Sequence, residues 1–127
     1  MRVEEYVAAE AAKPFAWGHT DCCSTADRWV QSAIGVSPLG EFGEWDGSRE
    51  RAMECIMHPY ALPARFNRAM RKAGIKRTTQ PVAGDIGLVR FDGRLCISIH
   101  AGTFWFSRHE DGLVGAPLGN IWKAWAI

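Results

Sequence analysis

The hydrophobic pattern of this chain changes its period once, and that change limits the folds open to it. Through the N-terminal half, apolar residues recur every three or four positions, as in amphipathic helices. From residue 86 onward they alternate with polar residues, and Asp92 and Gly93 separate the alternating segments 86–91 and 94–101 in the manner of a type I′ hairpin turn. Helices followed by an antiparallel meander indicate an α+β domain, with helices packed on one face of a small sheet.

Turn and capping residues divide the chain into expected elements. Pro14, Gly35 and Gly74 each end an expected helix. The glycine-rich stretch 35–47 is a long loop, in which Trp45 is the tryptophan best placed to line a surface cleft. The expected helices cover residues 2–12, 22–34, 49–57 and 60 or 62 to 73, the expected strands cover 86–91, 94–101, 103–107 and 113–114, and residues 120–124 fit either a short helix or a strand.

The composition is that of one globular domain spanning residues 1–127. The chain is long enough to bury a core, and its 47% hydrophobic and 23% charged residues are ordinary for such a domain. A net charge of +1 argues against nucleic acid as a partner, and the longest apolar runs are too short to span a membrane. The acidic, amphipathic N-terminus is unlike a secretory signal, so we expect the chain in a reducing cytoplasm before any assembly.

One run, Phe-Ala-Trp-Gly-His-Thr-Asp-Cys-Cys at residues 15–23, carries the strongest chemical signal. An aromatic-glycine turn leads into Asp21, a good helix N-cap, and Cys22 and Cys23 follow at the first helical positions. A helix start favours thiolate, the nucleophilic form of cysteine, through its unpaired amides and positive dipole end. The run therefore predicts Cys22 as a candidate nucleophile, while Cys23, about 100° further around the helix, points toward the core.

The cysteines show no pattern typical of a metal or cofactor site. None of the four forms a CxxC pair, and no cysteine–histidine spacing matches a zinc finger or ribbon. Cys55 lies in a helical apolar pattern typical of an inert core residue. A zinc site from Cys22, Cys23, Cys96 and a histidine is geometrically conceivable, since thiolates and imidazole suit zinc, but we expect no metal and no cofactor.

Two segments resemble a known family. They are Trp17-Gly18-x-x-Asp21-Cys22, and Gly84-Asp85-Ile86 followed by the strand Cys96-Ile97-Ser98-Ile99-His100-Ala101-Gly102. Together they resemble the NlpC-type cell-wall cysteine peptidases, a papain-like family that cleaves peptidoglycan stem peptides. The resemblance implies a papain-like fold, with the Cys22 helix packed on the antiparallel sheet and a histidine at the start of the second motif's strand.

The chain is similar over nearly its whole length to short phage and prophage tail-module proteins. Those proteins open with Phe-x-Trp-Gly-x-x-Asp-Cys-Cys and end near Gly-Leu-Val and Ala-Trp-x-Ile. The counterparts here are residues 15–23, 112–114 and 124–127, in the same order. This resemblance implies a tail-tip or tail-assembly role with other tail proteins as partners, in the host cytoplasm before assembly and in the particle's tail afterwards.

The second motif departs from the family pattern at its histidine. Aligned on Gly102, the family's His-Val-Gly-Ile-Tyr-x-Gly places Cys96 at the histidine position and His100 at the tyrosine position. A cysteine cannot replace imidazole as a base near neutral pH, because it must itself lose a proton. The expected general base is therefore missing from its usual place.

Two other histidines are candidate bases. The hairpin register places Asp85 opposite His100, where its carboxylate would orient the imidazole. His100 would lie two pleats, roughly 13 Å, from the usual position along the strand, so the Cys22 helix would have to shift. His19, just before the nucleophile, could also approach Cys22. The plainer interpretations are a half-buried His100 held by Asp85 and an exposed His19 in a turn.

Two classes of function follow. The first is a tail component with an NlpC-like fold and reduced or absent hydrolysis, which the cysteine at position 96 favours. The second is an active thiol endopeptidase or amidase acting on peptidoglycan peptides, which the intact cysteine presentation favours. In that enzyme Cys22 attacks a carbonyl, His100 or His19 is the base, Asp85 orients His100, and amides at the helix start hold the oxyanion.

Overall fold

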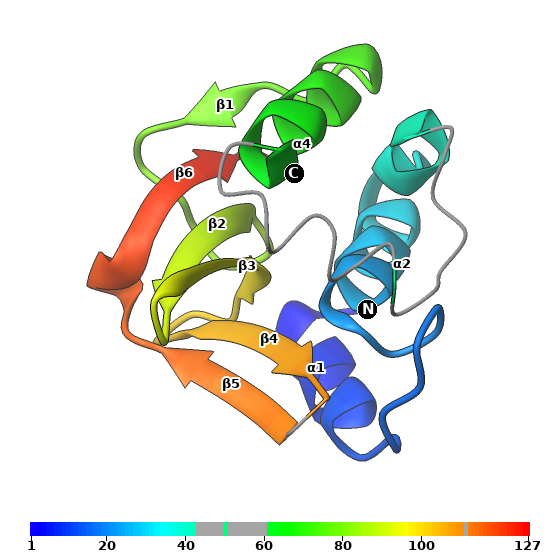
Figure 1. Ribbon diagram of the computed structural model, residues 1–127, viewed down its shortest axis with the longest axis vertical. Helices are drawn as coiled ribbons and strands as arrows, with labels where there is room; N and C mark the ends of the chain where they lie inside the picture. The colour runs from blue at the N-terminus through cyan, green and yellow to red at the C-terminus, as the bar shows by residue number, and fades with distance from the viewer. Residues whose placement is uncertain (43–49, 51–60, 111) are drawn as a thin grey trace.

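The structure, a computed structural model, describes residues 1–42, 50, 61–110 and 112–127 (Figure 1). The helix expected over 49–57, apart from residue 50, and the expectations for Trp45 and Cys55 lie outside these residues. In chain order the described elements are α1 (Val3–Ala11), α2 (Cys22–Ile34), the 3-10 helix η1 (Pro38–Phe42), α4 (Ala61–Lys72), β1 (Arg77–Thr78), β2 (Ile86–Phe91), β3 (Arg94–His100), β4 (Trp105–His109), β5 (Gly112–Ala116), the 3-10 helix η2 (Leu118–Asn120) and β6 (Ile121–Trp125).

The described helices begin and end close to the positions that the capping residues predict. α2 starts directly after Asp21 and ends before Gly35, which adopts the left-handed φ of 73°. α4 is followed by Gly74, with a φ of 77°. Glycine takes this conformation without steric cost, so it ends a helix where a residue with a Cβ would be strained.

The strands form one antiparallel sheet in the order β1-β6-β2-β3-β4-β5. Asp92 and Gly93, which join β2 to β3, both have positive φ, at 51° and 76°. A type I′ turn requires this at both central residues, and it pairs Phe91 with Arg94. The hairpin and register predicted from the sequence are confirmed.

Other parts of the sheet differ from the expected strands. The segment around residues 120–124, for which the sequence fits either a short helix or a strand, forms β6, and β6 lies between β1 and β2. β1 has no counterpart among the expected strands, because two residues are too few to show alternation. β4 begins at Trp105 because Gly102 has a φ of 99° and the Ala101 amide donates to the Phe104 carbonyl at 2.9 Å, which keeps the preceding residues in a turn.

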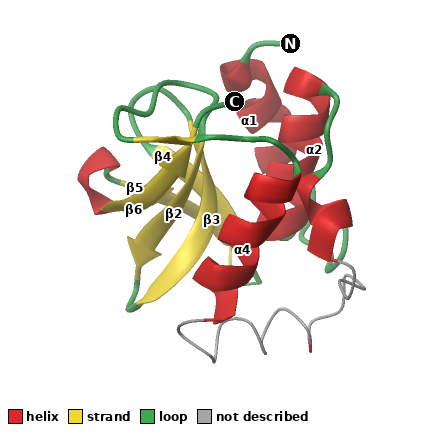
Figure 2. Ribbon diagram, turned by 90° about the horizontal axis from the view of Figure 1, so that it is seen from above, coloured by secondary structure: helices red, strands yellow, loops and turns green. Residues whose placement is uncertain are grey.

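The helices α1, α2 and α4 lie on one side of the sheet (Figures 1 and 2). The core between helices and sheet includes Trp29, Met70 and Ile97. The other face of the sheet carries a smaller cluster of Val89, Trp105, Ala116 and Ala124. The sheet curls toward this face, so that β5 also contacts β2. The α+β class and the packing of helices on one face are confirmed. No helix among the described residues is both long and apolar enough to cross a membrane.

Candidate functional site

A buried aspartate holds the start of α2. Asp21 is only 2% exposed, and one of its carboxylate oxygens accepts the Ser24 amide at 2.8 Å. The other accepts the Gly18 amide at 2.5 Å and the Ser24 hydroxyl at 3.1 Å. Gly18 has a φ of 82°, which a residue with a Cβ rarely adopts, so glycine permits the tight turn that brings its amide back to Asp21. The predicted N-cap is confirmed, and Cys22 is the first helical residue.

The sulfur of Cys22 receives hydrogen bonds that favour its thiolate. The Cys23 thiol, the Ile97 amide and the Cys23 amide donate to it and hold the pKa of Cys22 below its ordinary value. Burial and the charge of Asp21 oppose this shift. The net lowering follows because hydrogen bonds to the charged form stabilise it.

The Ile97 contact places Cys22 beside β3, on the side that faces β4. The amide and carbonyl of His100 form hydrogen bonds with Asp85 and Gly84, just before β2. Along a strand, successive residues direct these backbone groups alternately to the two neighbouring strands. Ile97 therefore points toward β4, where its carbonyl accepts the Ser107 hydroxyl at 2.8 Å. The paired part of β3 and β4 stops at Ile99, so the Ile97 amide is left to bond with Cys22.

Cys96 is the neighbour of this contact. It directly precedes Ile97 in β3 and pairs with Val89 across the hairpin. Burial raises the pKa of Cys96 to about 11, and the negative charge of Cys22 adds to the shift. The position at which the NlpC-like pattern has histidine thus lies next to Cys22, and it holds a thiol that stays protonated near neutral pH.

His100 and Asp85 are backbone partners, as the register predicts. The His100 amide donates to the Asp85 carbonyl, and the Gly84 amide donates to the His100 carbonyl, both at 2.9 Å. The Asp85 carboxylate, however, accepts the amides of Val82 at 2.8 Å and Ile127 at 3.0 Å. It therefore holds the chain end and the turn before β2, and among the described residues the Asp85 carboxylate forms no hydrogen bond with the His100 ring.

The ring of His100 faces the curled side of the sheet. It packs edge-on against Trp105 with centroids 4.9 Å apart, and its Nδ1 accepts the Gly102 amide at 3.1 Å. Its Cα lies three residues beyond Ile97, roughly 10 Å along the strand. The structure brings His100 to Asp85 and Trp105, and it does not bring His100 to Cys22.

The other histidines of the described chain lie elsewhere. His19 is exposed in the turn before Asp21, and its carbonyl accepts a bond from the Arg28 guanidinium. His109 ends β4 half-buried, with its ring 6.4 Å from that of Phe91. No histidine is among the described groups that shift the pKa of Cys22.

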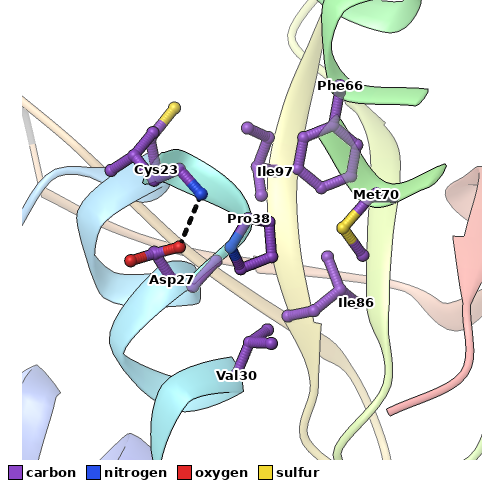
Figure 3. A pocket seen from close by; sticks show the side chains of 10 residues that line it. Cys23, Asp27, Val30, Pro38, Phe66, Met70, Ile86 and Ile97 are labelled. Atoms are coloured by element: carbon purple, nitrogen blue, oxygen red, sulfur yellow. Dashed lines mark hydrogen bonds between the residues drawn. The ribbon is translucent and has the colours of Figure 1, made fainter. Parts of the chain in front are cut away.

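A cleft opens beside Cys23, between α2, η1, α4 and the sheet (Figure 3). Asp27, 8% exposed, ties η1 to α2 by accepting the Leu39 amide and the Ser37 hydroxyl, each at 2.8 Å. The cleft is lined by Cys23, Ala26, Asp27, Val30, Pro38, Leu39, Phe66, Met70, Ile86 and Ile97. Its walls are mostly apolar, which suits an apolar side chain better than a charged group.

Sequence reasoning missed an ion-pair network behind the nucleophile turn. Glu10, 2% exposed, pairs with Arg28 at 2.7 Å and Lys13 at 3.0 Å. Arg108 of β4 donates to the carbonyls of Glu10 and Lys13, both at 2.7 Å. Since Arg28 also bonds to the His19 carbonyl, the network joins the end of α1 to the turn that presents Cys22. The signal in the sequence that could have revealed this network was Glu10, an acidic residue on the buried face of α1.

A family model described as Domain of unknown function (DUF6950) matches residues 1–127. The chain belongs to the DUF6950 family. No curated protein and no solved structure matches it significantly.

The chemistry open to this DUF6950 member follows from the thiols. Among the described residues, no group of three or more histidine, cysteine, aspartate or glutamate side chains is placed to hold a metal ion. Cys22 can act as a nucleophile, since its thiolate is stabilised without an imidazolium. The described part of the site does not bring to Cys22 a group that can protonate a leaving amine.

Proposed function

We propose that this chain is a phage or prophage tail-tip or tail-assembly protein with an NlpC-like, papain-like fold and reduced or absent hydrolysis. Support for the fold comes from a cysteine at the start of a capped helix that faces an antiparallel strand. Support for the tail role comes from the three ordered motifs, at residues 15–23, 112–114 and 124–127, shared with short tail-module proteins. The chain would be made in the host cytoplasm and then join other tail proteins in the particle.

The observation that carries the loss of hydrolysis is the thiol of Cys96, the residue that directly precedes the Ile97 contact with Cys22. Next to Cys22, where the pattern requires an imidazole, the chain has a thiol with its pKa raised to about 11. Acyl transfer to a thiolate needs an acid to protonate the leaving amine, and a base to activate water for release of the acyl group. A thiol that holds its proton so tightly supplies neither step efficiently at neutral pH.

One observation favours the second candidate, an active thiol endopeptidase or amidase on peptidoglycan stem peptides. Cys22 is already biased toward thiolate by its three donors, and the helix start offers backbone amides for an oxyanion. In that case the attack step is prepared, and the acid and base come from solvent or from a partner chain.

Restoring the imidazole tests the proposed fold relationship directly. The Cys96→His variant is incubated with purified peptidoglycan, and released peptides are measured by mass spectrometry beside wild type. We expect little or no release by wild type and a clear gain in the variant. The matched control is Cys22→Ser in the Cys96→His background, which should abolish the gain.

The outcomes separate the candidates. Hydrolysis by wild type that is lost in Cys22→Ser supports the enzyme and rejects the degenerate site. A folded Cys96→His variant that gains no activity argues against NlpC-like geometry. The tail role is tested separately by mass spectrometry of phage or phage-like particles from the host, and absence of the chain from purified tails would reject it.

A further inference from the structure

Three thiols lie at or near the start of α2, and hydrolysis explains only one of them. The Cys23 thiol donates to the Cys22 sulfur, and the Ile97 amide, which directly follows Cys96, donates to the same atom. Cys22, Cys23 and Cys96 are all half-buried and reduced. A sulfur hydrogen bond of about 4 Å to the Ile97 nitrogen places the Cys22 sulfur within about 6 Å of the Cys96 Cα.

From this cluster we propose that Cys22 and Cys96 form an oxidative modification site, at which a hydroperoxide oxidises Cys22 and Cys96 then closes a disulfide with it. The proposal goes beyond the proposed function and does not rest on it. It requires only the three thiols and their neighbours, whether or not the chain cuts peptides or joins a tail.

The first step uses the stabilised thiolate. The Cys22 sulfur attacks one oxygen of a hydroperoxide, the O–O bond breaks, and the sulfur becomes sulfenic acid while hydroxide or an alkoxide leaves. The donors from Cys23 and Ile97 keep Cys22 in the reactive form without any histidine. Cys96, whose thiol holds its proton, reacts more slowly with peroxide.

The second step forms the cross-link. The Cys96 sulfur attacks the Cys22 sulfur, the S–O bond breaks, and the hydroxyl leaves with the Cys96 proton as water. Cys23 is the wrong partner despite its hydrogen bond. Adjacent Cα atoms are about 3.8 Å apart, below the range of ordinary disulfides of about 4.4 to 6.8 Å, and both residues belong to the first turn of a regular helix.

The disulfide would join the start of α2 to β3. Oxidation would therefore block the Cys22 nucleophile and link two elements that the hydrogen bond from Ile97 already holds together. Reduction by a thiol would restore the free cysteine, so the modification is reversible in a reducing compartment.

Mass mapping of the oxidised full-length chain tests the proposal. Reduced protein is treated with hydrogen peroxide, the remaining thiols are blocked with N-ethylmaleimide in denaturant, and the chain is digested without reductant. Before the thiols are blocked, we expect a monomer lighter by two hydrogen atoms. After digestion, we expect a cross-linked peptide pair containing Cys22 and Cys96, and loss of that pair on treatment with dithiothreitol.

Variants distinguish the two steps. In Cys96→Ser, Cys22 should stop at sulfenic acid and be captured by dimedone, whereas the matched control Cys23→Ser should still form the disulfide. In Cys22→Ser, thiol loss should slow by about tenfold or more. Results from wild type alone can overturn the proposal. They are a cross-link to Cys23, to Cys55 or between two chains, and first oxidation at a cysteine other than Cys22.

Discussion

The backbone amide of Ile97 in β3 donates a hydrogen bond to the sulfur of Cys22 at the start of α2. This contact joins two segments that lie far apart in the sequence, and it places the thiol where β3 is no longer paired with β4. It also brings Cys96 next to Cys22, so the chemistry of the site depends on two neighbouring thiols.

Replacing Asp21 should separate its capping role from its charge. Asp21→Ala removes the acceptor for the Gly18 and Ser24 amides and should lower the free energy of unfolding by about 1 to 2 kcal/mol. Asp21→Asn keeps a good capping group and removes a negative charge that raises the pKa of Cys22, so that pKa should fall further. Urea unfolding and the pH dependence of Cys22 alkylation measure the two effects. A rise in the pKa of Cys22 in Asp21→Asn would contradict this electrostatic account.

Removing Arg28 should destabilise the fold because it leaves the buried Glu10 carboxylate with one cation. Arg28→Met should lower the free energy of unfolding by about 2 kcal/mol, below the usual cost for a fully buried pair, because Lys13 remains. Lys13→Met is the matched control and should cost less than about 1 kcal/mol, since the Lys13 side chain is 50% exposed. Equal losses in the two variants, by chemical denaturation, would argue against a special role for Arg28.

Adding one methyl group at Gly87 should overpack the curled face of the sheet. A Cβ there would lie 2.7 Å from the Ile121 side chain and 2.8 Å from the Trp105 ring. Gly87→Ala should therefore cost about 1 to 3 kcal/mol of stability. At Gly115, another strand position, the nearest atom would be at an ordinary 3.5 Å, so Gly115→Ala serves as the control and should be nearly neutral. Thermal unfolding measures both variants, and equal stability of Gly87→Ala and Gly115→Ala would indicate a looser sheet than the structure shows.

The raised pKa of Cys96 makes stability depend on alkaline pH. Burial lifts the pKa of Cys96 to about 11 in the folded chain, above the unfolded value of about 8.5. The folded state therefore disfavours the thiolate, and the contribution is fully present below the unfolded pKa and lost as pH rises through the folded pKa. Wild type should lose more stability than Cys96→Ala between pH 8.5 and 11. The comparison cancels the similar contribution of Tyr6, whose pKa burial also raises. Parallel stability curves for the two proteins would show that Cys96 ionises freely when folded.

Much of the local structure could be predicted from the residues themselves. The limits of α2 follow from Asp21 and Gly35, whose preferences act within one helical turn. The β2–β3 register follows from Asp92 and Gly93, because a two-residue turn allows only one pairing. The opposition of Asp85 and His100 is an extension of that same register.

Tertiary structure decided what these groups do. The Asp85 carboxylate holds the Ile127 amide at the end of the chain, the His100 ring packs on Trp105, and β6 lies between β1 and β2. The sequence by itself determined the helix that presents Cys22 and the hairpin that contains Cys96, because caps and tight turns depend on neighbouring residues. Only the packing of α2 against β3 brought Cys22 beside Cys96 and left the His100 ring on Trp105, farther along the same strand, because contacts between distant segments depend on burial and shape across the whole fold.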